Sequence, residues 1–241
     1  DALNIYQSGI GFGWDEEKYN KWWPADVHVI GKGIIRFHAV YWPAFLLSAG
    51  LKLPKKIFVH GYYTVNGQKM SKTIGNVYDP VPLLEKYGAD PLRYYCLAKT
   101  PPFTDGDFSE EKFVEAYNAD LANGLGNLVA RVAKLIERSG IQYSVFSIQF
   151  TDEKFLDKFR FDEALKTIWE WISELDQQIE KDQPWKLEGN DLEKILAGYR
   201  ENILRIATAL QPFLPETAEK ILAQFKGPEI KSGAPLFPRI Q

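Results

Sequence analysis

Hydrophobic and polar positions follow one pattern before about residue 100 and a different pattern after it. In the first part, two short apolar runs, Val27 to Ile30 and Ile57 to His60, have the length of buried strands. The aromatic-rich run between them, Lys32 to Leu47, is long enough for a helix. Two strands joined through a helix predict a right-handed β-α-β unit with a parallel sheet.

Helix signals dominate the second part. A long helix is expected to begin with Ser109 as its N-cap, followed by Glu110 and Glu111 in the first turn, and to end at Gly140. Three more helices are expected, at about residues 162–181, 191–210 and 215–225. Short loops indicate antiparallel neighbours in a bundle. Five apolar residues of the long helix share one face: Leu121, Leu125, Leu128, Val132 and Ile136.

Two shorter helices and a proline pair lie between these parts. One helix is predicted over Val81 to Tyr87, and Asp90 is predicted to cap another that reaches about residue 99. The pair Pro101-Pro102 cannot continue a helix. The sequence therefore predicts an α/β domain over residues 1–102 and an all-α domain over residues 103–241.

Charge is distributed unevenly. Between Asp26 and Asp79 there is no Asp or Glu. Seven cationic residues lie there: Lys32, Arg36, Lys52, Lys55, Lys56, Lys69 and Lys72. Because the whole chain is −3, the remaining residues sum to −10. This segregation indicates an anionic ligand for the block, whereas the mild net charge argues against indiscriminate coating of nucleic acid.

The most informative segment of this block is the loop from Gly67 to Thr73, which follows an apolar strand. Open α/β sheets bind ligands where strands end. Lys69, Ser71 and Lys72 can gather two mobile cations and a hydroxyl around a polyphosphate during nucleotidyl transfer. A Lys-x-x-Lys turn by itself is more often an ordinary solvated loop.

The amino-acid sequence of this loop resembles that of a known family. The run from His60 to Thr73 reads HGYYTVNGQKMSKT, and its last five residues resemble the KMSKS signature of class I aminoacyl-tRNA synthetases, with Thr73 for the final Ser. With the run IGKGIIRFHAVYWP from Ile30 to Pro43, it resembles methionyl-tRNA synthetases in particular. The resemblance extends to about Phe225. It implies the second half of a Rossmann-like, parallel-sheet catalytic domain followed by a helical-bundle anticodon-binding domain.

The resemblance also implies an activity. The family activates methionine with ATP and Mg²⁺ to methionyl-adenylate and then transfers it to tRNA(Met). It gives catalytic roles to Lys69, Ser71 and Lys72. It extends the ATP site to Met70, Thr73, His60 and Tyr63. The alternatives are a non-catalytic tRNA-binding module that retains a relic of the signature, and a related synthetase for leucine or cysteine.

Phe37, His38 and Trp42 shape the methionine side-chain pocket in the same resemblance. Aromatic walls suit a polarisable thioether. Without the family, aromatic residues that pack a helix onto the sheet would be the better interpretation.

Anticodon contacts are implied for Asn127, Arg131 and Trp185. Asn127 and Arg131 are four residues apart, so an amide and a guanidinium can address the edge of one unstacked base. An ordinary polar helix face is the alternative. Trp185 matches a residue that stacks on an anticodon base in the family, although a Trp after a Pro is otherwise more often core.

Other parts of the family are expected outside this chain. Asp1 is not a translation start, so the chain is expected to be part of a longer protein. The family's first catalytic half, with its HIGH motif, and its inserted zinc-bearing domain would be missing; the string His28 to Gly31 is not the HIGH motif, because it lacks the second His. We therefore expect the N-terminal half as a partner, and no catalysis by this chain alone.

One position departs from the family. Gly33 stands where the family usually has an Asp whose carboxylate contacts the nucleotide ribose. Three interpretations remain open: one ribose contact is lost, the chain is a variant, or another group compensates.

The cysteine content and the apolar runs indicate the cellular compartment of the chain. The single Cys96 permits no intramolecular disulfide and no Cys-based metal site, which fits a reducing cytoplasm. No apolar run approaches the length of a membrane span. We expect a cytoplasmic chain without membrane contact and without a metal site of its own.

Overall fold

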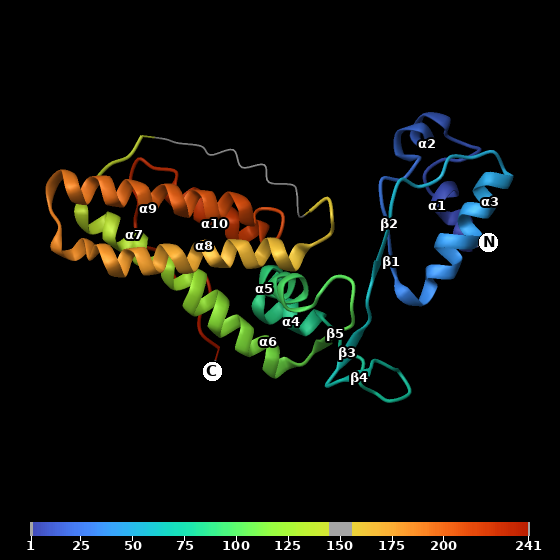
Figure 1. Ribbon diagram of the computed structural model, residues 1–241, viewed down its shortest axis with the longest axis horizontal. Helices are drawn as coiled ribbons and strands as arrows, with labels where there is room; N and C mark the ends of the chain where they lie inside the picture. Colours follow the sequence, from blue (N-terminus) through green and yellow to red (C-terminus); the bar gives the residue numbers. More distant parts are fainter. Residues whose placement is uncertain (1, 145–155, 241) are drawn as a thin grey trace. The chain divides into compact units, whose positions relative to one another are not determined.

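The computed structural model describes residues 2–144 and 156–240, and the chain divides into two compact units. Unit 1 comprises Asp1–Thr64 and Pro102–Gly106, and unit 2 comprises Val65–Pro101 and Asp107–Gln241. The units differ from the two domains predicted from sequence, because the segment Val65–Pro101 belongs with the helices that follow it (Figure 1).

Unit 1 contains the predicted parallel strand pair. β1 (His28–Gly31) and β2 (Ile57–His60) pair in parallel, with Gly31 opposite His60 at their carboxyl ends. The predicted helix between them is a succession of three helical types: a 3-10 turn η2 (Lys32–Ile34), a π-helix η3 (Phe37–Tyr41) and α3 (Trp42–Ser48). Three short elements precede β1: η1 (Ala2–Asn4), α1 (Ile5–Ser8) and α2 (Glu16–Trp22).

A second, three-stranded sheet was not predicted. Its strands β3 (Tyr63–Val65), β4 (Gln68–Lys69) and β5 (Gly106–Phe108) follow the order β4-β3-β5. Asn66 and Gly67 join β3 to β4, both with positive φ (53° and 74°), as a two-residue hairpin turn requires. The Asn-Gly pair was the sequence signal that could have found this hairpin.

The helices of unit 2 match the sequence expectations closely. α4 (Val81–Tyr87) ends at Gly88, and α5 (Ala89–Tyr94) continues into a π-helix, η4 (Tyr95–Lys99). The predicted long helix is α6 (Glu110–Ala116), the π-helical η5 (Tyr117–Gly126) and α7 (Asn127–Ser139) in succession, with Gly140 left-handed after it. The bundle is completed by α8 (Phe161–Asp182), the 3-10 turn η6 (Pro184–Lys186), α9 (Gly189–Leu210) and α10 (Pro215–Phe225).

One apolar core joins the helices of unit 2. The five residues predicted to share a face of the long helix are all at most 1% exposed. Ser109 caps α6 as predicted, since its side chain accepts a hydrogen bond from the Lys112 N–H. The capping role predicted for Asp90 is wrong. Asp90 lies inside the first turn of α5, and its carboxylate instead accepts from the Thr217 N–H at 2.7 Å, in the first turn of α10.

Candidate functional sites

The signature loop is fixed by one amide side chain. The Asn76 carboxamide accepts a hydrogen bond from the Ser71 N–H at 2.8 Å and donates one to the Lys69 carbonyl at 3.1 Å. The Ser71 hydroxyl accepts from the Thr73 N–H at 3.2 Å. These bonds fold the backbone between Lys69 and Asn76 into a compact turn, so its side chains are presented from a defined frame.

The loop presents its cations to solvent. The side chains of Lys69, Lys72 and Thr73 are exposed, and Met70 and Ser71 are half-buried. Within the part of the chain that the structure describes, no carboxylate forms an ion pair with Lys72. An unpaired ammonium on a flexible stem is suited to a phosphate that arrives with a ligand.

The other residues predicted for the ATP site lie in unit 1. His60 is the last residue of β2, and its Nδ1 donates to the Gly61 carbonyl at 2.8 Å. Tyr63 begins β3 and is 36% exposed. The residues predicted for the ATP site are therefore divided between the two units of the chain.

The residues predicted for methionine binding separate into two groups. His38 is 4% and Trp42 is 2% exposed, and both rings contact Tyr6, with centroid distances of 5.6 and 6.2 Å. Phe37 is 50% exposed and packs on Tyr41 instead. The structure thus brings His38 and Trp42 together around Tyr6, and leaves Phe37 outside this cluster.

Two hydrogen bonds fix the orientation of the His38 ring. Nδ1 donates to the Ile34 carbonyl at 3.0 Å, and Nε2 shares a hydrogen bond with the Tyr6 hydroxyl at 2.9 Å. The ring centroid of His28 lies 4.6 Å from that of Tyr6. Burial lowers the pKa of His28 below its ordinary value, and the nearby His38 lowers it further. Two imidazoles and the rings of Tyr6 and Trp42 give this cluster a polarisable lining.

The three predicted anticodon residues lie on α7 and on the turn after α8. Arg131 donates to Asp176 at 3.0 Å and to Glu180 at 2.5 Å, both on α8. Its guanidinium lies 5.8 Å from the Trp185 ring centroid, within cation–π range. Asn127 is exposed one turn earlier on α7. Arg131 and Trp185 therefore lie together, and Asn127 is exposed one helical turn away from Arg131.

Trp185 is not a core residue. Its side chain is 54% exposed, whereas Pro184 before it is buried. Gln183 turns the chain with a positive φ of 47°, and the Tyr199 hydroxyl bonds Asp182 at 2.8 Å just ahead of it. The turn is therefore anchored on both sides while the indole faces solvent, which removes the core-packing interpretation.

Sequence reasoning missed several residues of these sites. Asn76, Tyr6 and His28 were not singled out, and neither were the two acids that bind Arg131. Asp176 and Glu180 are four residues apart on a predicted helix, a spacing that places them on one face. That spacing could have been read from the sequence. The pairing of Tyr6 with His38, 32 residues away, could not.

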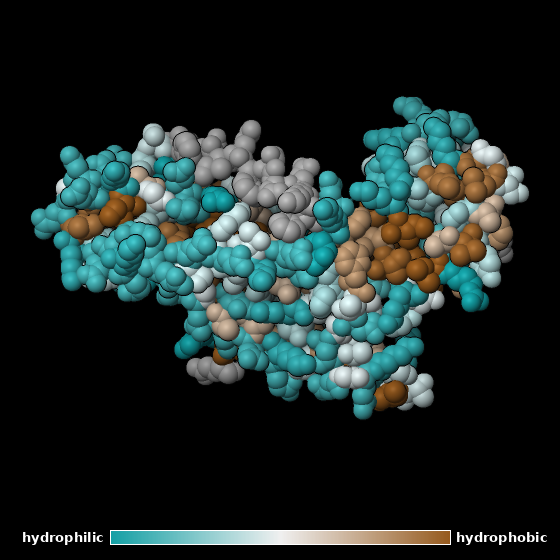
Figure 2. Space-filling view, in the orientation of Figure 1, coloured by the Kyte–Doolittle hydropathy of each residue, from teal (hydrophilic) through white to brown (hydrophobic). Residues whose placement is uncertain are grey.

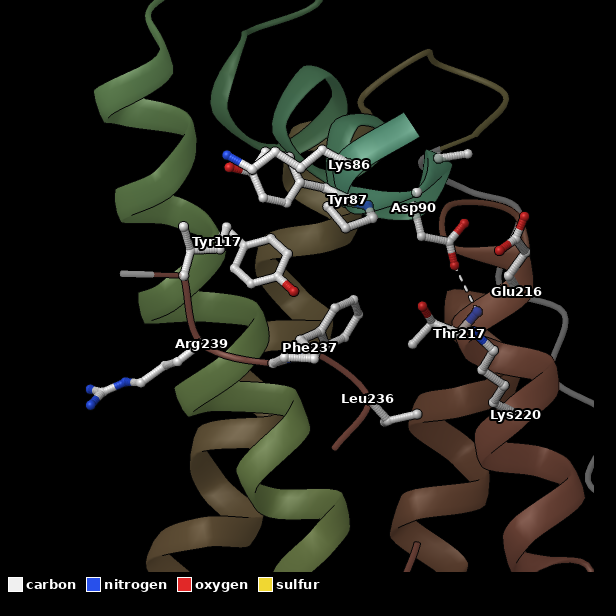
Figure 3. A pocket seen from close by; sticks show the side chains of 15 residues that line it. Lys86, Tyr87, Asp90, Tyr117, Glu216, Thr217, Lys220, Leu236, Phe237 and Arg239 are labelled. Carbon is white, nitrogen blue, oxygen red and sulfur yellow. Dashed lines mark hydrogen bonds between the residues drawn. The ribbon is translucent and has the colours of Figure 1, made fainter. Parts of the chain in front are cut away.

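Unit 2 also contains a cavity of about 500 Å³ that none of the predicted residues line (Figure 3). The Tyr117 hydroxyl points into it, and Tyr87 and Phe237 form its walls. Asp90 lies at one side, bonded to the Thr217 N–H. This hollow lies between α5, the start of α10 and the C-terminal segment.

Comparisons with known proteins show which family this chain is similar to. The family model described as tRNA synthetases class I (M) matches residues 1–133. The methionine–tRNA ligase of Thermotoga maritima is 42% identical over 92% of this chain, and that of Clostridium acetobutylicum is 40% identical over the whole of it. The structure of Mycobacterium tuberculosis methionyl-tRNA synthetase in complex with methionyl-adenylate superposes with a TM-score of 0.85 at 36% identity, over 99% of this chain and 55% of that one.

The matched model and the shared fold define a class I aminoacyl-tRNA synthetase. Within that class, the chain belongs to the methionyl-tRNA synthetase family. It spans 38% of the Thermotoga protein and 43% of the Clostridium protein. In its described residues, no helix is long and apolar enough to cross a membrane.

Proposed function

We propose that this chain supplies the C-terminal part of a methionine–tRNA ligase, in which unit 1 and the signature loop contribute to the adenylation site and the helices of unit 2 read the anticodon. The observation that carries this proposal is the meeting of Arg131 with the exposed Trp185. A planar donor beside an open aromatic face offers stacking and hydrogen bonding to one unstacked base.

The reaction assigns distinct tasks to the loop. The carboxylate of methionine attacks the α-phosphorus of ATP, and pyrophosphate leaves. Lys69 and Lys72 stabilise the charge that develops on the phosphates, and Ser71 and Thr73 contribute hydroxyl groups. Mg²⁺ arrives with ATP and neutralises phosphate charge. The 3′-terminal adenosine of tRNA(Met) then attacks the adenylate and releases AMP.

His38 and Trp42 form the methionine pocket in this proposal. The His38 ring, held by Tyr6 and Ile34, offers a polar edge beside the apolar face of Trp42, and a polarisable thioether suits such aromatic walls. Phe37 is exposed and would close the pocket only with the N-terminal half in place.

The partner of unit 1 is the N-terminal half of the catalytic domain. Figure 2 shows apolar atoms gathered on the surface of unit 1. Within residues 29–47, seven large apolar side chains are at least 44% exposed: Val29, Ile34, Ile35, Phe37, Val40, Phe45 and Leu47. Exposed apolar surface on this scale marks an interaction site. The relatives supply a matching segment, since each is more than twice as long as this chain. We place the assembled protein in the cytoplasm, where Cys96 stays reduced.

Methionine-dependent exchange of pyrophosphate into ATP tests the catalytic part of the proposal. The chain is combined with a polypeptide that carries the N-terminal half of the Thermotoga relative. Exchange by the mixture, and none by either piece alone, is the expected result. The matched control replaces methionine with leucine or cysteine, which should support no exchange.

A non-catalytic tRNA-binding module is the second candidate, and Gly33 favours it. In that case the mixture would bind the anticodon of tRNA(Met) and would show no exchange. The intact loop clamped by Asn76 opposes this candidate, because a module that only binds RNA has no use for an ordered phosphate loop.

A further inference from the structure

Gly33 faces the hydroxyl of Tyr62. A Cβ added at residue 33 would lie 2.1 Å from the Tyr62 hydroxyl oxygen and 3.2 Å from the ring carbon that carries it. Gly33 does not have the positive φ that requires glycine. The backbone would therefore accept a side chain there, and the Tyr62 hydroxyl would have to move to admit it.

The position of Tyr62 is fixed by its neighbours in unit 1. Its N–H donates to Asp105 at 2.8 Å, and the Lys32 ammonium lies 4.7 Å from its ring centroid. Lys32 and Asp105 are joined at 2.6 Å. The ammonium and the Tyr62 N–H hold the pKa of Asp105 below its ordinary value, so this carboxylate stays charged.

A second close approach brings Asp105 to this place. A Cβ at Gly61 would lie 1.9 Å from the Thr104 carbonyl oxygen, so only glycine allows the segment before Asp105 to pass here. Gly61 and Gly33 therefore both leave space for a neighbour by lacking a side chain. Gly61 leaves space for the segment that ends in Asp105, which binds the Tyr62 N–H, and Gly33 leaves space for the Tyr62 hydroxyl.

This cluster lies at a ligand-binding edge of the sheet. Gly31 and His60 are paired at the carboxyl ends of β1 and β2, and Gly33 and Tyr62 each follow two residues later. Ligands of open α/β sheets bind at this edge. A phenol hydroxyl both donates and accepts hydrogen bonds, as a ribose hydroxyl does, whereas a carboxylate only accepts.

We propose that the Tyr62 hydroxyl hydrogen-bonds a ribose hydroxyl of ATP in place of the carboxylate that the family resemblance implies for residue 33, and that Gly33 is the residue that makes room for it. This inference rests on the proposed function, because it names a contact in the same adenylation site. Of the three interpretations of Gly33, it favours the one in which another group compensates for the missing carboxylate, and it identifies that group as Tyr62.

The steric part of the pair is testable in the chain itself. Gly33→Ala in a helical turn would ordinarily stabilise by removing backbone freedom. Here we expect it to lower the melting temperature by about 2–4 °C, the shift that corresponds to about 1 kcal/mol in a chain of this size. In the Tyr62→Phe background the loss should shrink, because the atom at 2.1 Å is gone. Equal losses in both backgrounds would overturn the steric pairing.

The ligand part is tested in the mixture with the N-terminal half. Calorimetric titration compares ATP, 2′-deoxy-ATP and 3′-deoxy-ATP. Tyr62→Phe should weaken ATP binding about 2- to 10-fold, the loss of one neutral hydrogen bond. The deoxynucleotide that lacks the bonded hydroxyl should bind the unmodified chain and the variant equally. Tyr41→Phe, an exposed tyrosine of η3, is the matched control and should change nothing.

The possible results separate this inference from the function beneath it. If ATP binds and Tyr62→Phe weakens all three nucleotides by the same factor, Tyr62 supports the fold only and the inference is wrong. The inference is also wrong if the variant leaves all three affinities unchanged. If the mixture binds no ATP at all, the proposed function and the inference fail together.

Discussion

The two units of the chain differ in how far each can stabilise itself. The core cluster of unit 1 is small, consisting of the buried Tyr19, Trp23, Trp42 and Leu46, and much of the other apolar surface of this unit is exposed. Unit 2 buries residues from all its long helices, and from α4 and α5, in one continuous core. Because burial of apolar surface is the main stabilising term in folding, unit 2 is the self-sufficient part. Unit 1 depends on what covers it.

The division also separates the sites proposed for the phosphates and for methionine and ribose. The signature loop belongs to unit 2, whereas the residues proposed for methionine and ribose belong to unit 1. The cations are supported differently as well. Lys72 is exposed in a turn, and Arg131 is fixed between two carboxylates and an indole. Charge that appears during a reaction can be met by a mobile ammonium, whereas a base edge requires a planar donor held in place.

The largest expected effect is on the loop of unit 2. In the mixture with the N-terminal half, Lys72→Ala should lower the adenylation rate by about 10²–10³-fold, as for the loss of one electrostatic donor to the transition state. Methionine affinity should stay the same, because the residues proposed for methionine binding, His38 and Trp42, lie in unit 1. Lys194→Ala, an exposed lysine on α9, is the control and should leave the rate unchanged. Parallel losses in rate and methionine affinity would show that Lys72 acts structurally.

The stability of unit 2 should depend on one buried carboxylate. Asp90 is 3% exposed and bonds the Thr217 N–H at the start of α10, where a negative charge also suits the helix dipole. Asp90→Ala should lower the free energy of unfolding by about 1.5–3 kcal/mol, measured by urea denaturation of the chain. Asp90→Asn keeps an acceptor and should cost less. Equal costs for the two variants would mean that the bond does not matter.

RNA binding should depend on Trp185. Trp185→Ala should weaken binding of a CAU anticodon hairpin by about 1–3 kcal/mol, the worth of stacking one base on an aromatic ring. Fluorescence anisotropy with a labelled hairpin measures it. Trp14 of unit 1 is also exposed, at 65%, and Trp14→Ala should leave the affinity as it was. The assignment of Trp185 is wrong if both variants bind alike.

The smallest expected effect is a loss of stability of unit 1 at acidic pH. Burial and His38 lower the pKa of His28 below its ordinary value, so the folded state favours the neutral ring. The unfolded chain takes up a proton near pH 6.5, and the folded one only at lower pH. Stability from this group is therefore present above about pH 6.5 and is lost as pH falls through the folded pKa. An NMR titration of the His28 Cε1 proton should give a midpoint below 6.5, and a midpoint above it would contradict the burial argument.

The parts of the fold that local pattern determines could be predicted. The apolar face from Leu121 to Ile136, the caps at Ser109 and Gly140, and the strand pair β1-β2 all follow from spacing and end signals. The π-helical turns could not be predicted, because they depend on packing against other segments. In η5, for example, the Tyr117 ring packs against Phe237 of the C-terminal segment, with the ring centroids 5.9 Å apart.

The candidate sites could be predicted only where the family signature names residues. The family resemblance supplied Lys72 and Trp185, but not the side chains that hold their neighbours. Asn76 clamps the loop through two bonds to the backbone, and Asp176 binds Arg131 across 45 residues. Asp90 was misread for the same reason. The local sequence predicts that Asp90 caps a helix, but the N–H that it binds belongs to Thr217, 127 residues away.

The most direct test of the account is anticodon recognition by the chain without its N-terminal half. The helices of unit 2 have their own core and hold Arg131 and Trp185 together, so recognition should need nothing else. Affinities are measured for hairpins that differ only in the anticodon: CAU and single-base changes at each position. The account predicts that CAU binds most tightly, with the same preference when the N-terminal half is added. Equal affinity for all the hairpins would contradict it.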